Sequence, residues 1–388
     1  MEKILVVHTN YKNIGGEDIA VANEINSLKT KYEVMGLYYK NDLKNFVFQL
    51  MSFLTNKNVS SIKKFKQTIK YFNPDIIYIH NTWFKASPFI INEAFKLNIP
   101  IILKLHNFRL FCGDSYLIKN HVEDETICLA CGKKSKKFGF FNDYFNKNFI
   151  KSIFLIWHNK KLIRFVNKFN VKVLTLTNFQ KNYFINKNVI RKNIYVQRNF
   201  SNEKSEVSIE YNPNSSYIVY SGRISREKGV EFLIKNFLDS NLKNINLKIL
   251  GDGPLLASLK KTYNNDSIEF IGEKNNLYSR NLIAKSRALV TCTTLYEGHP
   301  TIFTEAIFSQ VPVIFPDNGG LKEFFPENYD LVYDGSSIDL KTKLRLLDSE
   351  ETLLKISQNN KKYYFNNFSN SKLLENFSKI INYPNLSS

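Results

Sequence analysis

The stretch that decides the fold is YIVYSGRISREKG at residues 217–229. Its first four residues, Tyr217–Tyr220, form a short apolar run that predicts a buried strand, and the residues after the loop have helical spacing. The loop between them carries Arg223 and Lys228. The stretch therefore predicts a strand, a polar loop with two cations at the carboxyl end of that strand, and a helix.

The same order of strand, loop and helix recurs on both sides of this stretch. In the second half, further strands are predicted at residues 247–250, 268–271, 288–291 and 313–315. In the first half, they are predicted at residues 4–7, 76–79, 101–105 and 171–176, and Gly15-Gly16 separates the first of them from a helix over residues 17–28. Strands that alternate with helices predict an α/β fold with doubly wound parallel sheets.

The length of the chain predicts two domains, because 388 residues exceed what one hydrophobic core usually organises. The polar stretch at residues 199–215 has the composition of a linker. We expect Rossmann-like domains over residues 1–200 and 201–365, and a C-terminal helix over residues 366–388 that crosses back to the first domain. Ligands of such sheets bind at the carboxyl ends of the strands, which predicts a site in an interdomain cleft.

The formal net charge of +19 is confined to the first half of the chain. Residues 1–200 contain 32 Lys and Arg against 13 Asp and Glu, whereas residues 201–388 contain 22 of each sign. This asymmetry indicates an anionic partner for the N-terminal domain, which is nucleic acid, an anionic membrane surface or a phosphorylated substrate. The alternative is a lysine-rich surface that only keeps the protein in solution.

Neither a leader nor a membrane span is evident in the sequence. The apolar run in Met1–His8 is too short for a signal peptide, and no stretch of about 18 apolar residues exists. The four cysteines are too few for a disulfide scaffold in a chain of this length, so reduced thiols are expected. These features predict a cytoplasmic protein.

Two carboxylates flank a predicted helix start in the segment Glu297-Gly298-His299-Pro300-Thr301-Ile302-Phe303-Thr304-Glu305. If the helix begins near Pro300, its free N–H groups form a site for a diphosphate. Glu297 and Glu305 can then accept hydrogen bonds from hydroxyl groups of one ligand; the alternative is that they are two solvated acids. Arg223 and Lys228 can neutralise a pyrophosphate leaving group. The turn at Gly251–Pro254 permits close backbone approach or is an ordinary turn.

Together these stretches resemble the retaining glycosyltransferases of family 4. The matching segments are Gly15-Gly16-Glu17, Leu105-His106-Asn107, Ser221–Gly229, Gly251–Pro254, Phe270-Ile271-Gly272, Glu297–Glu305 and Gly319-Gly320. The resemblance implies the GT-B fold and transfer of a sugar from a nucleotide sugar with retained configuration, without a metal or other cofactor. The sequence contains no Asp-x-Asp motif of the metal-dependent type.

The resemblance also implies roles for individual residues. Arg223 and Lys228 would hold the donor diphosphate, Glu297 a sugar hydroxyl, and His106 would lie beside the donor sugar. The remaining donor contacts would come from Gly15, Gly16, Gly272, Glu273, Lys274, Gly298, His299, Pro300, Thr301, Ile302 and Glu305. His299 stands where the family often has phenylalanine, so the resemblance does not fix the donor sugar. For His106 the alternative is a hydrogen-bonded core histidine.

Cys112 and the pair Cys128-x2-Cys131 resemble a subgroup of the same family that carries this cysteine loop. With His121 or His158 as a fourth ligand, the three thiolates could bind a structural zinc ion. Reduced, partly buried thiols are the favoured interpretation. Cys292 is expected to be a core residue.

Residues 133–172 combine eleven Lys and Arg with a single acidic residue and many aromatic side chains. This mixture is typical of a helix that lies on anionic lipid. The alternative is an ordinary amphipathic helix whose aromatic residues enter the core. A membrane contact would bring the N-terminal domain to a lipid-diphosphate acceptor.

The sequence thus predicts a peripherally membrane-associated glycosyltransferase on the inner face of the cell membrane. Its donor is a UDP-sugar in preference to a GDP-sugar, and its acceptor is a lipid-linked glycan or a surface polysaccharide such as capsule or lipopolysaccharide. A nucleotide-sugar epimerase of the same architecture and a non-catalytic anion-binding or nucleic-acid-binding protein are the alternatives. No nucleic-acid motif supports the last of these.

Overall fold

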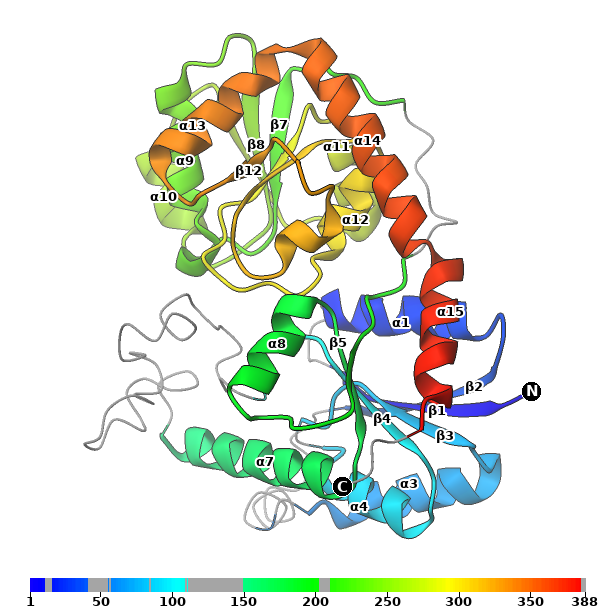
Figure 1. The fold of residues 1–388 in the computed structure, drawn as a ribbon. Helices are drawn as coiled ribbons and strands as arrows, with labels where there is room; N and C mark the ends of the chain where they lie inside the picture. Colours follow the sequence, from blue (N-terminus) through cyan, green and yellow to red (C-terminus); the bar gives the residue numbers. More distant parts are fainter. Residues whose placement is uncertain are drawn as a thin grey trace. The chain divides into compact units, whose positions relative to one another are not determined.

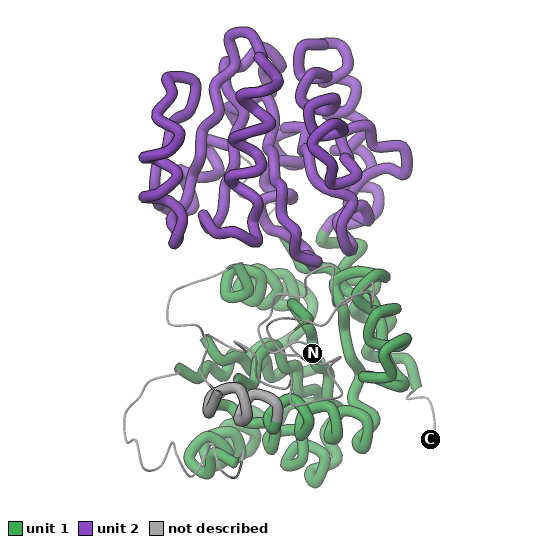
Figure 2. The backbone as a smooth tube through the Cα atoms, turned by 90° about the vertical axis from the view of Figure 1, so that its left-hand side faces the viewer, with its two compact units in different colours: residues 1–201, 370–388 green, residues 202–369 purple. Residues whose placement is uncertain are grey.

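The computed structural model describes residues 1–10, 16–40, 55, 57–83, 85–108, 110, 149–201 and 210–384. The chain forms two compact units, which Figure 2 shows in different colours. Unit 1 contains residues Met1–Ser201 and Asn370–Ser388, and unit 2 contains residues Asn202–Ser369. Unit 1 is therefore completed by the last segment of the chain.

Within the described residues, unit 1 has a six-stranded parallel sheet in the order β2-β1-β3-β4-β5-β6. Its strands are β1 (Lys3–Asn10), β2 (Glu33–Lys40), β3 (Ile76–Ile79), β4 (Ile101–Leu105), β5 (Lys172–Thr175) and β6 (Ile194–Val196). Strands β3 and β4 are buried along their whole length, because helices cover both faces of a parallel sheet. The chain reverses its winding direction between β1 and β3.

The helices of unit 1 lie on both faces of this sheet (Figure 1). They are α1 (Gly16–Leu28), α3 (Val59–Phe72), α4 (Phe89–Lys96), α7 (Phe149–Lys168), α8 (Asn178–Asn186) and α15 (Asn370–Asn382). Helix α15 packs Leu373 and Phe377 into the same core as β1 and β3. Its C-terminal end is held by Lys172 Nζ, which donates hydrogen bonds to the carbonyls of Ile380, Ile381 and Tyr383 at 2.7–3.0 Å.

Within the described residues, unit 2 has a second six-stranded parallel sheet, in the order β12-β11-β10-β7-β8-β9. Its strands are β7 (Tyr217–Ser221), β8 (Asn246–Leu250), β9 (Ile268–Gly272), β10 (Leu289–Val290), β11 (Val313–Pro316) and β12 (Val332–Tyr333). This is the strand order of dinucleotide-binding folds, with the change of winding direction between β7 and β10. The two sheets confirm the expected α/β fold with two parallel sheets.

Figure 1 shows the sheet of unit 2 between two helical layers, with α9, α10 and α13 on one side and α11, α12 and α14 on the other. Their bounds are α9 (Val230–Ser240), α10 (Leu256–Thr262), α11 (Asn276–Ala284), α12 (Thr301–Phe308), α13 (Ser337–Arg345) and α14 (Glu350–Phe368). Cys292 is buried in the core of this unit, as the sequence predicts.

Candidate functional site

The loops after β7 and β10 meet where the winding direction of unit 2 changes. Lys228 lies on a short 3-10 turn (Arg226–Lys228) after β7, and Glu297 lies on the loop after β10. Lys228 Nζ forms an ion pair with Glu297 Oε1, and the two side chains remain 26% and 24% exposed. Ligands of open α/β sheets bind in the crevice at such a switch point. Two residues far apart in sequence are thus joined in the expected place.

Glycines fix the loop that carries the two predicted cations. A Cβ at Gly251, whose φ is +137°, would lie 1.9 Å from the carbonyl oxygen of Gly222, and one at Gly253 would lie 2.3 Å from that of Ile224. Backbone hydrogen bonds join the same loops, from Gly222 N–H to Leu250 O at 3.0 Å and from Ile224 N–H to Asp252 O at 2.9 Å. These glycines therefore allow the loop after β8 to approach the loop after β7 closely. This approach sets the position of Arg223, which is exposed.

A third glycine ties the same loop to β10. Gly229 has a φ of +66°, and a Cβ there would lie 2.0 Å from the carbonyl oxygen of Cys292. Next to it, Thr294 N–H donates to the carbonyl of Glu227 at 2.9 Å. The turn of Lys228 and the segment leading to Glu297 are thus held together by backbone contacts in addition to their ion pair.

Helix α12 begins at Thr301, with Pro300 as its N-cap residue and no side chain capping its first N–H groups. The predicted helix start near Pro300 is confirmed. Uncapped N–H groups at a helix start can bind an anion. Thr301 and Ile302 are partly exposed there, whereas Gly298 is buried.

Glu305 lies in the second turn of α12 and is partly buried. Burial raises its pKa above the ordinary value, while a hydrogen bond from Asn276 and the nearby Arg280 act in the opposite direction. The Asn276 Nδ2 to Glu305 Oε1 distance is 3.4 Å. Glu305 is therefore placed against α11, while Glu297 pairs with Lys228 after β7. The first turn of α12 therefore lies between the two glutamates in the chain.

The imidazole of His299 points into the core of unit 2. It stacks on Phe324 with ring centroids 4.1 Å apart, and its Nε2 lies 3.0 Å from Thr304 Oγ1. His299 therefore fills an aromatic position as phenylalanine would. The expected influence of this residue on the donor sugar could only come from its backbone.

The remaining predicted donor residues lie at the ends of strands or outside the described part of the chain. Gly272, with a φ of +80°, ends β9, and Glu273 and Lys274 follow it as exposed residues. Gly16 begins α1. Gly15 lies outside the described residues, as do Cys112, Cys128 and Cys131. Among the described residues, no group of three or more His, Cys, Asp or Glu side chains could hold a metal ion.

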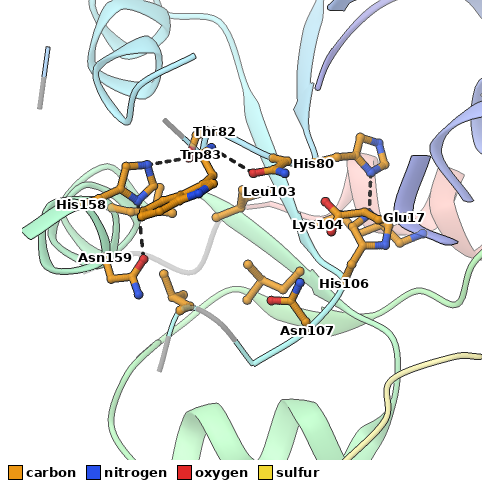
Figure 3. Close-up of a pocket in the computed structure, with 14 residues that line it drawn as sticks. Glu17, His80, Thr82, Trp83, Leu103, Lys104, His106, Asn107, His158 and Asn159 are labelled. Atoms are coloured by element: carbon orange, nitrogen blue, oxygen red, sulfur yellow. Dashed lines mark hydrogen bonds between the residues drawn. The ribbon is translucent and has the colours of Figure 1, made fainter. Parts of the chain in front are cut away.

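In unit 1, His106 follows β4 and lines a pocket of about 60 Å³ (Figure 3). The pocket is also lined by Glu17, His80, Asn81, Thr82, Trp83, Leu103, Lys104, Leu105, Asn107, Leu110, His158, Asn159 and Leu162. His158 is buried, with its Nε2 3.4 Å from Thr82 Oγ1 and its ring against that of Trp83. His106 is thus at the carboxyl edge of its sheet, in a pocket whose lining combines neutral polar and aromatic groups with Glu17 and Lys104.

Behind His106 lies a buried polar cluster that the sequence did not reveal. His80 Nδ1 is 2.9 Å from His106 Nε2, and burial lowers the pKa of both rings well below the ordinary value of 6.5. Nearby, Lys104 Nζ pairs with Glu24 Oε2 at 2.7 Å, and both side chains are completely buried. Tyr78 donates a hydrogen bond to the other Glu24 oxygen. The signal that could have found His80 is its place directly after a predicted strand, at the same sheet edge as His106.

Comparison with known proteins shows what class of domain unit 2 contains. Residues 201–363 match the family model described as glycosyl transferases group 1. An alpha-1,4-N-acetyl-D-galactosaminyltransferase of Campylobacter jejuni is 30% identical over 172 residues, which are 42% of this chain and 47% of that protein. An uncharacterized glycosyltransferase of Methanocaldococcus jannaschii is 26% identical over 269 residues, 66% of this chain and 58% of that one. The chain thus matches about half the length of these relatives.

Solved structures agree on the fold. The structure of Anabaena HepE in complex with UDP superposes with a TM-score of 0.67 at 14% identity, covering 98% of this chain and 99% of that one. The fold is therefore that of GT-B glycosyltransferases, and residues 201–363 are similar to the glycosyl transferases group 1 family. No helix among the described residues is both long and apolar enough to cross a membrane.

Proposed function

We propose that this protein is a retaining glycosyltransferase that takes a sugar from a nucleotide-diphosphate sugar without a metal ion. The observation that carries the proposal is the Lys228–Glu297 pair at the switch point of unit 2, beside the uncapped start of α12. Both features lie in the segment that matches the glycosyltransferase model. A cation for a diphosphate and a carboxylate for a sugar hydroxyl are the groups that a bound nucleotide sugar requires.

In the proposed reaction, the bond between the anomeric carbon and the diphosphate oxygen breaks while an acceptor hydroxyl attacks from the same face and transfers its proton to the departing diphosphate oxygen. The departing nucleoside diphosphate gains negative charge, which Lys228 and Arg223 stabilise together with the N–H groups of α12. Glu297 orients a sugar hydroxyl, and Glu305 accepts hydrogen bonds from the ribose. Gly272, Glu273 and Lys274 border the base, with uracil preferred to guanine. His106 hydrogen-bonds the transferred sugar.

The donor preference is supported by the solved structure in complex with UDP. The acceptor is proposed to be a lipid-linked glycan on the way to a surface polysaccharide. In support, the Campylobacter jejuni relative is named for the acceptor GalNAc-alpha-(1->4)-GalNAc-alpha-(1->3)-diNAcBac-PP-undecaprenol. The excess of positive charge in the N-terminal half suits a diphosphate-linked acceptor.

A panel of nucleotide sugars screened by thermal shift tests the donor site. We expect a UDP-sugar to raise the melting temperature of the wild type. Arg223→Ala should lower the affinity for that donor about tenfold or more, because a charge-assisted hydrogen bond to phosphate is lost. Arg226→Ala is the matched control, since Arg226 is an exposed arginine three residues after Arg223 in the chain, with no role in the proposal. Equal donor binding by all three proteins would contradict the proposal.

The stabilising donor is then incubated with candidate lipid-linked acceptors, and free nucleoside diphosphate is measured. Release that depends on the acceptor, with retained configuration in the product, is the expected result. Interconversion of the donor sugar without acceptor would instead indicate an epimerase. Binding without either reaction would leave only a nucleotide-sugar-binding protein, and the proposed activity would be rejected.

We further propose that α7 brings unit 1 to an anionic membrane surface. Trp157 is 49% exposed, and Lys160, Arg164 and Lys168 follow it on the same helical face. Helix α7 contains no acidic residue. An exposed indole beside a basic face is typical of an interfacial helix.

The triple variant Lys160→Ala/Arg164→Ala/Lys168→Ala is expected to bind vesicles of anionic phospholipid at least about a hundredfold more weakly, at about 1 kcal/mol per charge lost. The measurement is co-sedimentation at low salt. The matched control Lys243→Ala/Lys260→Ala/Lys261→Ala removes the same charge from exposed positions of unit 2. If both variants bind equally weakly, the interaction depends on the net charge of the protein and not on α7, which contradicts the proposal. If the wild type does not bind the vesicles, the membrane proposal is wrong.

A further inference from the structure

His80 directly follows β3, and its ring contacts the ring of His106 in the pocket. Its backbone N–H donates to the carbonyl of Val7 at 2.9 Å, which fixes it to β1. Its Nδ1 lies 2.9 Å from His106 Nε2, and the two rings stack with centroids 5.2 Å apart. On its other side, His80 packs against the ring of Tyr78 at 4.4 Å. Neither ring of the histidine pair can turn without breaking these contacts.

The two nitrogens of His106 have different surroundings. Nε2 is taken up by His80, whereas Nδ1 makes no hydrogen bond within the part of the chain that the structure describes. The residue is only partly buried and lines the pocket. Nδ1 is therefore the nitrogen that is available to a ligand.

The surroundings of the pair also decide where its protons lie. His80 Nε2 is buried and has no hydrogen-bond partner among the described residues. The charged and titratable groups around the pair are His8 with its partner Asp18 on β1 and α1, Tyr78 on β3, Lys104 on β4, Glu24 and Glu17 on α1, and His158 on α7. The Lys104 cation adds to burial in keeping both rings neutral.

A buried N–H without an acceptor is rarer than an unused lone pair, and a nearby cation favours the lone pair further. The unpartnered Nε2 of His80 is therefore the bare nitrogen, and the proton of this ring lies on Nδ1. His80 then donates to His106 Nε2, which leaves the proton of His106 on Nδ1.

We propose that His80 is a positioning residue that holds His106 in the Nδ1–H tautomer, with that N–H available as a neutral donor to a sugar hydroxyl oxygen in the pocket. The proposal rests on the proposed function for the identity of the ligand. If His106 Nδ1–H is the donor, then His106 selects sugars that present a hydrogen-bond acceptor to it. A cationic His106 is excluded from the role, because a protonated ring could not accept the hydrogen bond from His80.

The tautomer can be measured without activity, by nitrogen-15 NMR of histidine-labelled protein. The chain has six histidines, and His106→Gln identifies the resonances of His106. We expect a protonated Nδ1 and a bare Nε2 in the wild type, and a shift toward protonated Nε2 in His80→Leu. An unchanged tautomer in His80→Leu, or a protonated Nε2 in the wild type, would overturn the proposal.

Kinetics provide a second readout. His80→Leu is expected to lower kcat up to about a hundredfold, because a misplaced group near the reacting atoms is costly. His80→Asn should restore much of the lost kcat, since its amide N–H can lie near the place of Nδ1. His80→Gln should not restore kcat, because its amide lies one carbon farther from the backbone. His8→Leu is the matched control, because His8 is a buried histidine of the same cluster that has no hydrogen bond to His106.

Equal activity of the asparagine and glutamine variants would contradict the proposal, even if the leucine variant does not fold. The NMR result separates this inference from the proposed function. If no nucleotide sugar or acceptor gives turnover with the wild type, the proposed function fails, while the tautomer of His106 and its dependence on His80 can still be established or refuted.

Discussion

Replacing Lys228 by alanine is expected to lower kcat for glycosyl transfer about a hundredfold to a thousandfold, as for other preorganised groups that stabilise developing charge. Lys228 is held in place before a donor arrives, because Glu297 pairs with it and the glycine contacts fix its turn. Negative charge grows on the leaving diphosphate only in the transition state. The loss should therefore appear mainly in kcat and less in KM for the donor.

The measurement is the initial rate of nucleoside diphosphate release at saturating donor, with Lys235→Ala as control. Lys235 is an exposed lysine of α9 that pairs with Glu231, so its replacement removes the same charge from outside the site. Stability should change little in Lys228→Ala, because both partners of its ion pair are partly exposed.

A double variant separates a catalytic from a structural role of this pair. If Lys228 served only to neutralise Glu297, Lys228→Ala/Glu297→Ala would recover activity relative to Lys228→Ala. We expect no recovery, because both side chains are proposed to contact the donor. A double variant as active as the wild type would remove Lys228 and Glu297 from the mechanism.

Much of the fold could be predicted because the central strands are short, continuous apolar runs. Residues 76–79 and 101–105 were predicted with the bounds that the structure has. Strand β2 was missed because its sequence, EVMGLYYK, is polar at both ends and only two of its residues are buried. The two-residue strand β12 is too short to give a pattern of its own. Edge strands carry little of the apolar signal on which sequence analysis depends.

The C-terminal helix was predicted over residues 366–388, but the structure divides this part of the chain between two helices. They are α14, which ends at Phe368, and α15, which begins at Asn370. Ser369 between them has an extended backbone, with a ψ of 151°. No glycine or proline marks this break, only the Asn- and Ser-rich residues that surround Phe368 at 366–371. The division follows from packing, since α15 buries its apolar residues in unit 1.

Parts of the candidate site could be predicted where a functional side chain directly follows a strand, because the strand then indicates at which sheet edge the side chain lies. Lys228, Glu297 and the start of α12 are such parts, since each follows a predicted strand. The pairing of His80 with His106 could not be predicted, because it depends on the register of β3 against β4. Lys104 was hidden for a different reason. It lies within the apolar strand Ile101–Leu105, where a charged side chain is unexpected until its partner on α1 is known.

Lys104→Met is expected to lower the free energy of unfolding by about 3–5 kcal/mol, because it leaves the carboxylate of Glu24 buried without its cation. Both side chains are 0% exposed, so water cannot replace the lost partner. The hydrogen bond from Tyr78 to Glu24 compensates only in part. The measurement is urea unfolding of each variant, with the midpoint and slope compared to those of the wild type.

The double variant Lys104→Met/Glu24→Gln is the decisive comparison. It removes both charges, and the glutamine can still accept the hydrogen bond from Tyr78, so most of the lost stability should return. A double variant as unstable as the single one would mean that the packing of the lysine stem, and not its charge, stabilises this part of unit 1.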